Sequence, residues 1–477
     1  MLARLEHRGP DDHGEVQVNG SWLGHRRLSI VDVESGHQPL VTGDEGLYLV
    51  GNGEIYNHEQ VRERLTDGAY STRSDNEVAL HLIRERGPDA LGELEGMFAL
   101  LAAGSDGTFV AARDPVGIKP LYWAQHDGAV RFASEMAAFD PGWLPHVEAF
   151  PPGHAWTPGG GLQRFARAVP RVPDDGIPSR DELRQILVTS VRRQLMGDVP
   201  VGVFLSGGLD STLVAAIAAR ELPEGERLKT FAVGLEGSSD IVAARTAAAF
   251  LGSDHHERLY TAAEALDVVP DVVRAIEHFD PSLVRSAVPN YLLAEMTAEH
   301  VKVVLTGEGA DELFAGYEYL RELTGDGELH DEIVRTVEGL HNLNLQRCDR
   351  VTMAHGLEAR VPFLDREVIA LALRLPAEAK LASSHDPEKK LLREAFQGWL
   401  PDELLWREKE QFGDGSGAAS VLTGAMESEV PEDEFESERG ELDPPLRTRE
   451  ELAYFRIWKR HLAGVRPERT VGRFATA

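Results

Sequence analysis

The fold of this chain is constrained most by ten residues, 203–212, which read VFLSGGLDST. The apolar run that ends at Leu205 is typical of a buried strand, and the residues from Ser211 onward have helical spacing. Between them, Ser206-Gly207-Gly208 predicts a tight turn, because glycine has no Cβ to obstruct the turn or an approaching ligand. N–H groups at the start of a helix favour an anion. The string therefore predicts an anion site at the carboxyl end of a strand.

Three polar side chains of this loop indicate the kind of anion. Ser206 and Ser211 supply hydroxyl donors, whereas Asp210 would repel a bare phosphate, so its place predicts a bridging Mg²⁺ ion. A lone Ser-Gly-Gly would be an ordinary junction between a strand and a helix. The whole string, however, resembles the pyrophosphate-binding loop of the ATP pyrophosphatases, which split ATP into AMP and pyrophosphate. It is not a Walker A loop, because no Gly-Lys-Ser/Thr follows.

A second loop has the same form. The strand expected at 301–305 leads into residues 306–312, which read TGEGADE and again make a glycine turn where doubly wound sheets bind ligands. Its three carboxylates would by themselves indicate an acidic helix cap. Together with the first loop, they predict that Glu308 is a general base or stabilises an intermediate, and that Asp311 is a Mg²⁺ ligand.

Strands and helices alternate in the second half of the chain. We expect helices at 181–195, 211–220, 243–251 and 450–462, and strands at 199–205, 229–235 and 301–305. Apolar strands that alternate with helices predict a parallel sheet covered on both faces. Before the last helix, the acidic residues 427–443 are expected to form a solvated or partly disordered loop.

The first half reads as β-rich. Short apolar runs at 47–50, 99–102, 122–123 and 130–133 predict strands, and Ser105-Asp106-Gly107 predicts a hairpin turn before a strand at 108–112. A helix is expected at 76–85, with Ser74 or Asp75 as its cap. The Pro- and Gly-rich residues 151–177 mark the best boundary between the halves.

Charge and cysteine content exclude several classes of protein. Acidic residues outnumber basic ones by 79 to 49, a net charge of −30 that disfavours binding to nucleic acid or to an anionic membrane. The single cysteine, Cys348, excludes an intrachain disulfide and Cys-cluster metal sites, and we expect it to be a buried side chain on a helix. No signal peptide or run of eighteen apolar residues is present, which predicts a cytoplasmic protein.

The motifs together resemble one family, the glutamine-hydrolysing asparagine synthetases of the bacterial and archaeal B type. Besides the two loops, the resemblance rests on residues 7–11 (HRGPD), 27–32 (RLSIVD), 52–57 (NGEIYN), 113–122 (RDPVGIKPLY), 356–365 (GLEARVPFLD) and 406–412 (WREKEQF). It implies an α+β N-terminal-nucleophile glutaminase domain of stacked antiparallel sheets at residues 1–165, incomplete at its start. It also implies an α/β doubly wound ATP pyrophosphatase-type synthetase domain at 178–477. Ammonia would pass between the two through an internal channel.

The resemblance implies a glutamine pocket in the first domain. Its residues would be Arg27, Leu28, Ile30, Val31, Asn52, Gly53, Glu54 and Asp75. Arg27 would hold the α-carboxylate of glutamine with two hydrogen bonds. Glu54 and Asp75 would accept from its ammonium group, and Asn52 and Gly53 would donate to an oxyanion.

In the second domain the resemblance implies sites for ATP and aspartate. The nucleotide would lie among Leu205, Val233, Thr306 and Gly307, and the pyrophosphate would lie on Ser206, Gly207, Gly208, Asp210 and Ser211, with Lys409 near the phosphates. Mg²⁺ would bind Asp210 and Asp311, and Ser282 and Arg285 would bind aspartate. The aspartate carboxylate would attack ATP to give β-aspartyl-AMP, which ammonia then converts to asparagine. The partners are thus small molecules, and the resemblance leaves a homodimer open.

The sequence departs from the family at the nucleophile. The family uses a cysteine at the mature amino terminus, whereas this sequence begins Met1-Leu2 and leads directly to His7. Two interpretations are open: the start is truncated, or glutaminase activity is lost and the enzyme uses free ammonia. The otherwise complete glutamine pocket favours truncation.

A second departure concerns the acceptor. Leu283 stands where the family usually has a second threonine, and the loss of that hydroxyl leaves room for another acceptor. A close alternative is therefore a related amidotransferase or β-lactam-type synthetase, and a more distant one is a non-catalytic paralogue. The intact segments at 356–365 and 406–412 favour asparagine synthesis, and the intact loops argue against a paralogue without activity.

Overall fold

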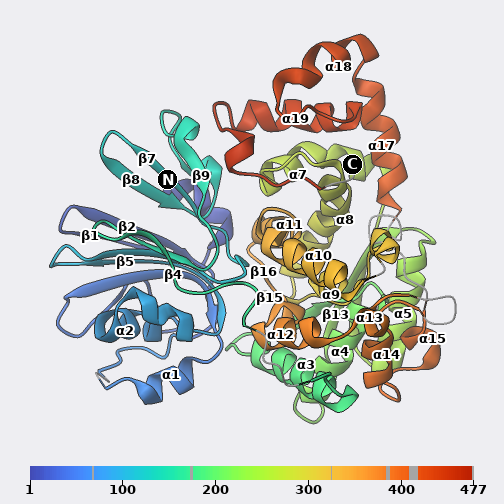
Figure 1. Cartoon of the computed structure of the whole chain (residues 1–477), viewed down its shortest axis with the longest axis horizontal. Helices are drawn as coiled ribbons and strands as arrows, with labels where there is room; N and C mark the ends of the chain where they lie inside the picture. Colours follow the sequence, from blue (N-terminus) through green and yellow to red (C-terminus); the bar gives the residue numbers. More distant parts are fainter. Residues whose placement is uncertain (67–68, 172–175, 324, 383–386, 408–416, 475–477) are drawn as a thin grey trace.

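The computed structural model describes residues 1–66, 69–171, 176–323, 325–382, 387–407 and 417–474. Antiparallel sheets form the first third of the chain and a parallel sheet lies in the remainder, and Figure 1 shows the two parts side by side. Both expected fold classes are therefore confirmed. No helix in the described part of the chain is long and apolar enough to cross a membrane.

A six-stranded antiparallel sheet is the centre of the first part. Its strands are, in spatial order, β11 (Gly161–Arg164), β10 (His154–Thr157), β6 (Phe109–Arg113), β5 (Gly96–Gly104), β4 (Leu47–Ile55) and β3 (Leu40–Val41). The hairpin of β1 (Asp12–Val18) and β2 (Ser21–Arg27) stacks on it through Leu23, Val50 and Ala103. A separate core lies between the sheet and the helices α1 (His58–Arg64) and α2 (Glu77–Arg86). Stacked antiparallel sheets are thus present, as expected.

The turn predicted at 105–107 joins β5 to β6. In this antiparallel pair of strands, Ala103 lies opposite Phe109. Gly107 has a φ of +92°, and its N–H donates to the carbonyl of Gly104 at 3.2 Å. A three-stranded sheet of β7 (Tyr122–His126), β8 (Ala129–Ala133) and β9 (Val147–Ala149) completes this part. Short 3₁₀ helices lie around these sheets: η1 (Leu2–Arg8), η2 (Pro88–Glu93), η3 (Met136–Ala138) and η4 (Leu144–His146).

The second part is built on a five-stranded parallel sheet. Its order is β14 (Asp254–Tyr260), β13 (Lys229–Leu235), β12 (Val201–Phe204), β15 (Val303–Leu305) and β16 (Glu358–Arg360). The interior of β13 is buried without alternation, because helices cover both faces of the strand. The helices nearest the sheet are α4 (Leu209–Glu221), α5 (Ser239–Leu251), α8 (Pro281–Ala298) and α11 (Asn344–Met353), and α3 (Arg180–Gln194) packs on α4.

Further helices surround this sheet. They are α6 (Ala262–Asp267), α7 (Val269–Ile276), α9 (Ala310–Leu313), η5 (Glu318–Glu322), α10 (Asp326–Gly339), η6 (Leu340–Asn342), η7 (Pro362–Leu364), α12 (Arg366–Arg374), α13 (Ala377–Lys380), α14 (Lys390–Ala395), α15 (Asp402–Leu405), α17 (Ala418–Glu429), α18 (Glu432–Glu438), η8 (Arg439–Glu441), α19 (Arg449–His461) and η9 (Pro467–Arg469).

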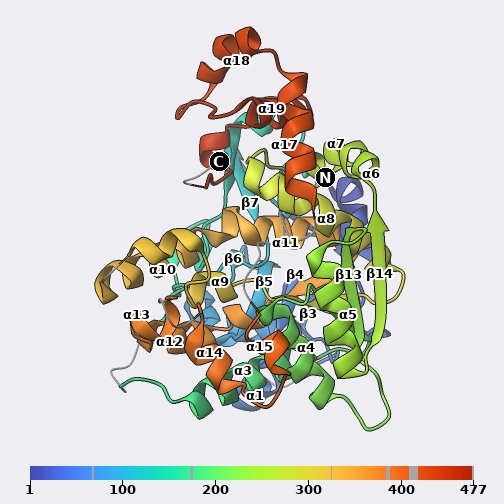
Figure 2. The same ribbon diagram turned by 90° about the vertical axis from the view of Figure 1, so that its right-hand side faces the viewer.

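The prediction of a loop at 427–443 is wrong. The end of α17, all of α18 and η8 occupy this acidic stretch, and α18 lies beside α19 in Figures 1 and 2. Two interactions explain why this stretch forms helices. Phe435 is buried, and Arg456 of α19 pairs with Glu434 and Glu438 at 2.6 Å each. Arg456, eighteen or more positions away along the chain, thus offsets part of the negative charge of this stretch.

The predicted cap of α2 is also wrong. Asn76 is the N-cap residue, and no side chain makes the capping hydrogen bond. The Asp75 carboxylate instead accepts from the backbone N–H of Ile55 at 2.6 Å, and it is therefore directed toward β4.

Candidate active site

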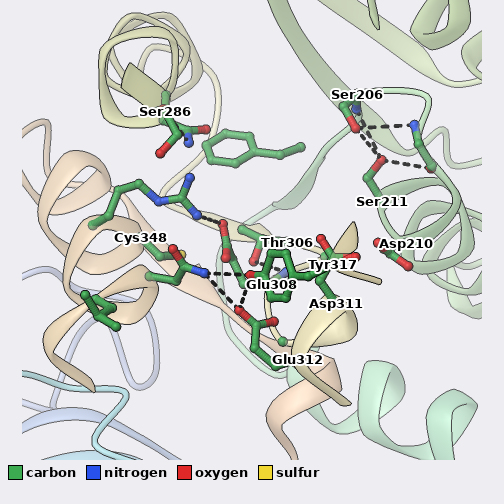
Figure 3. A pocket seen from close by; sticks show the side chains of 18 of the residues that line it. Ser206, Asp210, Ser211, Ser286, Thr306, Glu308, Asp311, Glu312, Tyr317 and Cys348 are labelled. Atoms are coloured by element: carbon green, nitrogen blue, oxygen red, sulfur yellow. Dashed lines mark hydrogen bonds and ion pairs between the residues drawn. The ribbon is translucent and has the colours of Figure 1, made fainter. Parts of the chain in front are cut away.

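A cavity of about 680 Å³ opens at the carboxyl ends of β12, β13 and β15. Twelve of the thirteen described residues predicted for ATP, aspartate and catalysis line it: Leu205, Ser206, Gly208, Asp210, Ser211, Val233, Ser282, Arg285, Thr306, Gly307, Glu308 and Asp311. Lys409 lies outside the described residues. In the view of Figure 3, Ser206 and Ser211 lie on one side of this larger cavity, Ser286 and Cys348 lie on the other, and Glu308 lies between them.

The remaining predicted residue, Gly207, lies against α5 and allows the loop to turn. Its φ is +73°, and a Cβ there would lie 2.5 Å from the backbone carbonyl carbon of Ala243 on α5. Only glycine satisfies both conditions without strain. The loop therefore folds back tightly before α4 begins.

Hydrogen bonds between the two serines stabilise this loop. The hydroxyls of Ser206 and Ser211 lie 3.0 Å apart, and the Ser206 hydroxyl also accepts from the N–H of Gly208 at 3.3 Å. The loop opens α4, whose dipole adds partial positive charge at this end. The loop geometry suits an anion with several oxygens, such as a pyrophosphate.

Lys389 lies between the two predicted metal ligands. Its Nζ is 2.6 Å from Asp210 Oδ2 and 2.5 Å from Asp311 Oδ1, and the residue is 2% exposed. Burial disfavours the ammonium group, but the two carboxylates outweigh burial and hold the pKa of Lys389 above its usual value. Sequence reasoning missed Lys389, because nothing in its local sequence indicates that it contacts loops 78 or more residues away.

The two carboxylates fit a Mg²⁺ ion that is shared with phosphate. The Asp210 and Asp311 carboxylates both pair with Lys389 Nζ, so they lie close to each other. Carboxylate oxygens are the ligands that Mg²⁺ prefers. Within the described ranges, no group of three or more His, Cys, Asp or Glu side chains could hold a metal by itself. Two carboxylates agree with the one or two protein ligands that Mg²⁺ takes when it also binds phosphate groups.

Glu308 is a carboxyl group whose pKa is raised by its surroundings. Burial raises its pKa to about 7, an effect that the ion pair with Arg347 of α11 opposes and that the Glu312 and Asp311 carboxylates increase. Glu312 is held by the Tyr317 hydroxyl at 2.6 Å and by Asn344 at 2.8 Å. A carboxyl group that titrates near neutrality suits a general acid or base. The sequence did not identify Arg347 as the partner of Glu308.

The acceptor end of the cavity is formed by α8. Ser282, Arg285, Ser286 and Asn290 lie on its cavity face at helical spacing. Leu283 is 1% exposed and is absent from the lining, so the structure gives no support to the expectation that Leu283 alters the acceptor site. The Arg285 guanidinium pairs with the buried Glu450 of α19.

A second, smaller cavity of about 110 Å³ contains all eight residues predicted to bind glutamine: Arg27, Leu28, Ile30, Val31, Asn52, Gly53, Glu54 and Asp75. The Arg27 guanidinium donates to the carbonyls of Val31, Asp32 and Val33 at 3.0, 2.7 and 3.3 Å, which fixes its position. Nη1 makes one of these bonds and Nη2 makes two. The predicted residues thus come together in space, although three separate segments of the chain supply them.

Two carboxyl groups in this smaller cavity have raised pKa values. Burial raises the pKa of Asp75 to about 6, although the N–H of Ile55 opposes the shift. Burial also raises the pKa of Glu54 well above its ordinary value, and the neighbouring Asp75 adds to this effect. Among the described residues, the Asn52 side-chain nitrogen and Glu54 Oε2 are buried without a hydrogen-bond partner. Both atoms suit a polar ligand.

Cys348 lines the larger cavity from α11 and is buried, as expected. Burial raises the pKa of its thiol to about 12, so the thiol stays protonated and is a poor nucleophile.

Comparisons with known proteins match both parts of the chain. The asparagine synthase family model matches residues 182–327 and 320–443, and the glutamine amidotransferase domain model matches residues 1–149. The chain is 41% identical to the probable glutamine-hydrolyzing asparagine synthetase of Schizosaccharomyces pombe, over 96% of this chain and 88% of the relative. It is 42% identical to the glutamine-hydrolyzing asparagine synthetase of Asparagus officinalis, over 87% of this chain and 74% of the relative. Among solved structures, the allosteric regulatory enzyme of purine biosynthesis aligns with a TM-score of 0.31 and 21% identity, over 54% of this chain and 76% of that chain.

Proposed function

The chain belongs to the family of glutamine-hydrolysing asparagine synthetases, which are ATP-dependent ligases, and on that premise we propose that it converts L-aspartate to L-asparagine. ATP is cleaved to AMP and pyrophosphate, and the nitrogen comes from glutamine or, where no glutaminase nucleophile is present, from free ammonia. The observation that carries the proposal is the convergence of two glycine-turn loops, a buried lysine and Glu308 on one cavity.

The first step is adenylation of aspartate. A side-chain carboxylate oxygen of aspartate attacks the α-phosphorus of ATP, the bond to the bridging oxygen breaks, and β-aspartyl-AMP and pyrophosphate form. The loop at Ser206–Ser211 binds the pyrophosphate, and Lys389 neutralises charge beside it. Asp210 and Asp311 would hold Mg²⁺, which supplies further positive charge to the phosphates.

The second step is amide formation. Ammonia attacks the acyl carbon, the bond from this carbon to the phosphate oxygen breaks, and AMP leaves. Ionised Glu308 accepts a proton from the attacking nitrogen, a role that suits a carboxyl group with a pKa of about 7. Arg347 keeps part of the Glu308 population ionised at neutral pH.

Aspartate would bind at the α8 end of the larger cavity, the ligase cavity, through Ser282 and Arg285. Since Leu283 does not line the cavity, it gives no reason to favour another acceptor. Glutamine would bind in the smaller cavity, the glutamine cavity, where Glu54 and Asp75 accept from its ammonium group. We also propose a cytoplasmic location and a homodimer as the oligomeric form to test. The two domains would comprise residues 1–165 and 178–477.

Pyrophosphate release tests the proposal. With ATP, Mg²⁺ and ammonium chloride, aspartate should stimulate release and glutamate should not, and Asp311→Asn should abolish the stimulation. The matched control is Asp271→Asn, which removes an exposed carboxylate on α7 and should leave the rate unchanged. If no acid stimulates release, the ligase function is refuted and a non-catalytic paralogue is supported. Stimulation by a different acid would replace aspartate as the acceptor.

A further inference from the structure

Strand β16 lies between the ligase cavity and the glutamine cavity. On one side it pairs in parallel with β15, and the carbonyl of Arg360 accepts from the N–H of Thr306 at 2.9 Å, where the second glycine-turn loop begins. On the other side, the Glu358 side chain lines the glutamine cavity. Met353, at the end of α11, lines it too. The ligase half of the chain thus supplies part of the glutamine cavity.

Side chains of β16 connect to the glutamine cavity through buried charges. Arg360 Nη2 lies 3.5 Å from Glu54 Oε1, and Arg360 Nε donates to Glu358 Oε1 at 3.0 Å. Glu358 Oε2 lies 3.0 Å from Lys119 Nζ. All four side chains are buried, so their charges act on one another with little screening by solvent.

The position of Arg360 is fixed by the backbone of the ligase half. Its Nη1 donates to the carbonyl of Gln194 at 2.8 Å and to that of Met196, both at the end of α3. Glu54, in contrast, belongs to β4 in the first half of the chain. The contact between Arg360 and Glu54 therefore depends on how the two halves are placed against each other.

We propose that Glu358 and Arg360 are positioning residues for glutamine: strand β16 of the ligase half sets the charge on Glu54, and thereby sets the affinity of the other half for glutamine. The proposal rests on the proposed function, because it takes glutamine as the ligand of the smaller cavity. Neither β16 residue needs to contact the substrate. Their effect reaches it through Glu54, whose carboxylate must be ionised to accept from the ammonium group of glutamine.

The balance of charges around Glu54 supports this. After burial, which raises the pKa of Glu54 most, the carboxylates of Asp75 and Glu358 raise it further, while Arg360 and Lys119 lower it. The other ionisable groups that face Glu54 or line its cavity are Tyr56, Arg8, His25, Arg26 and Arg27. Burial lowers the pKa of His25 to about 4, so this histidine is neutral near pH 7. The two β16 residues therefore act on Glu54 with opposite signs.

Because Arg360 and Glu358 shift the pKa of Glu54 in opposite directions, variants of the two residues distinguish an electrostatic role from a purely structural one. Glutamine binds the ionised form, so affinity is present above the pKa of Glu54 and is lost as the pH falls through it. Arg360→Met removes a positive charge and raises that pKa, which should move the pH of half-maximal affinity upward by about one unit or more. Glu358→Gln removes a negative charge and should move it downward. A purely structural role would weaken binding in both variants without opposite shifts.

The measurement is isothermal titration of the full 477-residue chain with L-glutamine across a pH series. The matched control is Lys302→Met, which breaks an ion pair of 2.7 Å with Asp11 between the same two halves but lines neither cavity. It should not shift the profile. Circular dichroism checks folding, and if Arg360→Met does not fold, the milder Glu358→Gln still decides, since only a downward shift agrees with the proposal.

Shifts in the same direction, or no shift, would overturn the inference. Failure of the inference is distinguishable from failure of the proposed function. If the unmodified chain forms asparagine from ammonia but binds no glutamine, the inference is overturned while the ligase function stands. If aspartate and ammonium yield no pyrophosphate, the proposed function itself is wrong.

Discussion

Replacing Arg347 by methionine should change the pH dependence of the ligase reaction. Arg347 and Glu308 form an ion pair in which both side chains are mostly buried. Methionine fills similar space but carries no charge, so the variant leaves Glu308 without its cationic partner. Because Arg347 opposes the rise in the pKa of Glu308, its loss should raise that pKa further above its present value of about 7.

The size of the effect follows from the ion pair. A neighbouring opposite charge lowers the pKa of a carboxyl group by about one to three units, so the pKa of Glu308 should rise to roughly 8 to 10 in Arg347→Met. At pH 7, half of the Glu308 population is ionised in the parent protein, against about a tenth for a shift of one unit. The rate at pH 7 should therefore fall about five-fold for a shift of one unit and several hundred-fold for three.

The assay is ammonia-dependent asparagine formation from pH 6 to 10, with rates expressed per unprotonated ammonia. The parent protein should lose activity as the pH falls through about 7, because ionised Glu308 is the active form. In Arg347→Met this loss should begin at higher pH, with recovery at alkaline pH. Arg335→Met is the matched control, since Arg335 also lines the cavity but pairs with Glu332. An unchanged acid limb in Arg347→Met would refute the role given to Glu308.

Three further predictions concern the buried lysine, the first glycine turn and the acceptor helix. Lys389→Met leaves two carboxylates facing each other, so without Mg²⁺ the free energy of unfolding should fall by roughly 1–4 kcal/mol, between the values for exposed and buried pairs. In denaturant titrations, millimolar Mg²⁺ should stabilise this variant more than the parent, and equal gains would contradict a shared cation site. Gly207→Ala should abolish pyrophosphate release. Gly208→Ala should retain part of it, because a Cβ at position 208 would meet only a serine side chain, at 3.3 Å. Equal losses in the two variants would show that the close approach of Gly207 to α5 is unimportant. Leu283→Thr should lower the melting temperature, because it buries a hydroxyl group. It should change the KM for aspartate by less than about two-fold. A markedly lower KM would place this side chain in the acceptor site.

The sequence predicted the fold best where local pattern and tertiary role agree. The strand expected at 229–235 is β13 with the same bounds, because its apolar residues are buried on both faces and its ends coincide with the ends of the pattern. The prediction of a loop at 427–443 was wrong. The helices there depend on the burial of Phe435 and on ion pairs with Arg456 of α19, and local charge density reveals neither.

The same distinction applies to the candidate site. All eight glutamine-pocket residues meet in one cavity, since motif matching carries information on spatial arrangement that no single segment contains. Lys389 and Arg347 were missed, because each is defined by partners far away in the sequence. The sequence also could not show where the Leu283 side chain lies: its neighbours Ser282 and Arg285 line the cavity, whereas helical geometry directs Leu283 into the core.

The most direct test of the account follows one oxygen atom. Aspartate labelled with ¹⁸O in its side-chain carboxylate is incubated with ATP, Mg²⁺, ammonia and the protein, and the products are analysed by mass spectrometry. If that carboxylate attacks the α-phosphorus, the oxygen that bridges carbon and phosphorus remains on phosphorus when ammonia displaces AMP. We therefore expect one ¹⁸O atom in AMP for each asparagine formed. Label in pyrophosphate, or asparagine formed with unlabelled AMP, would contradict it.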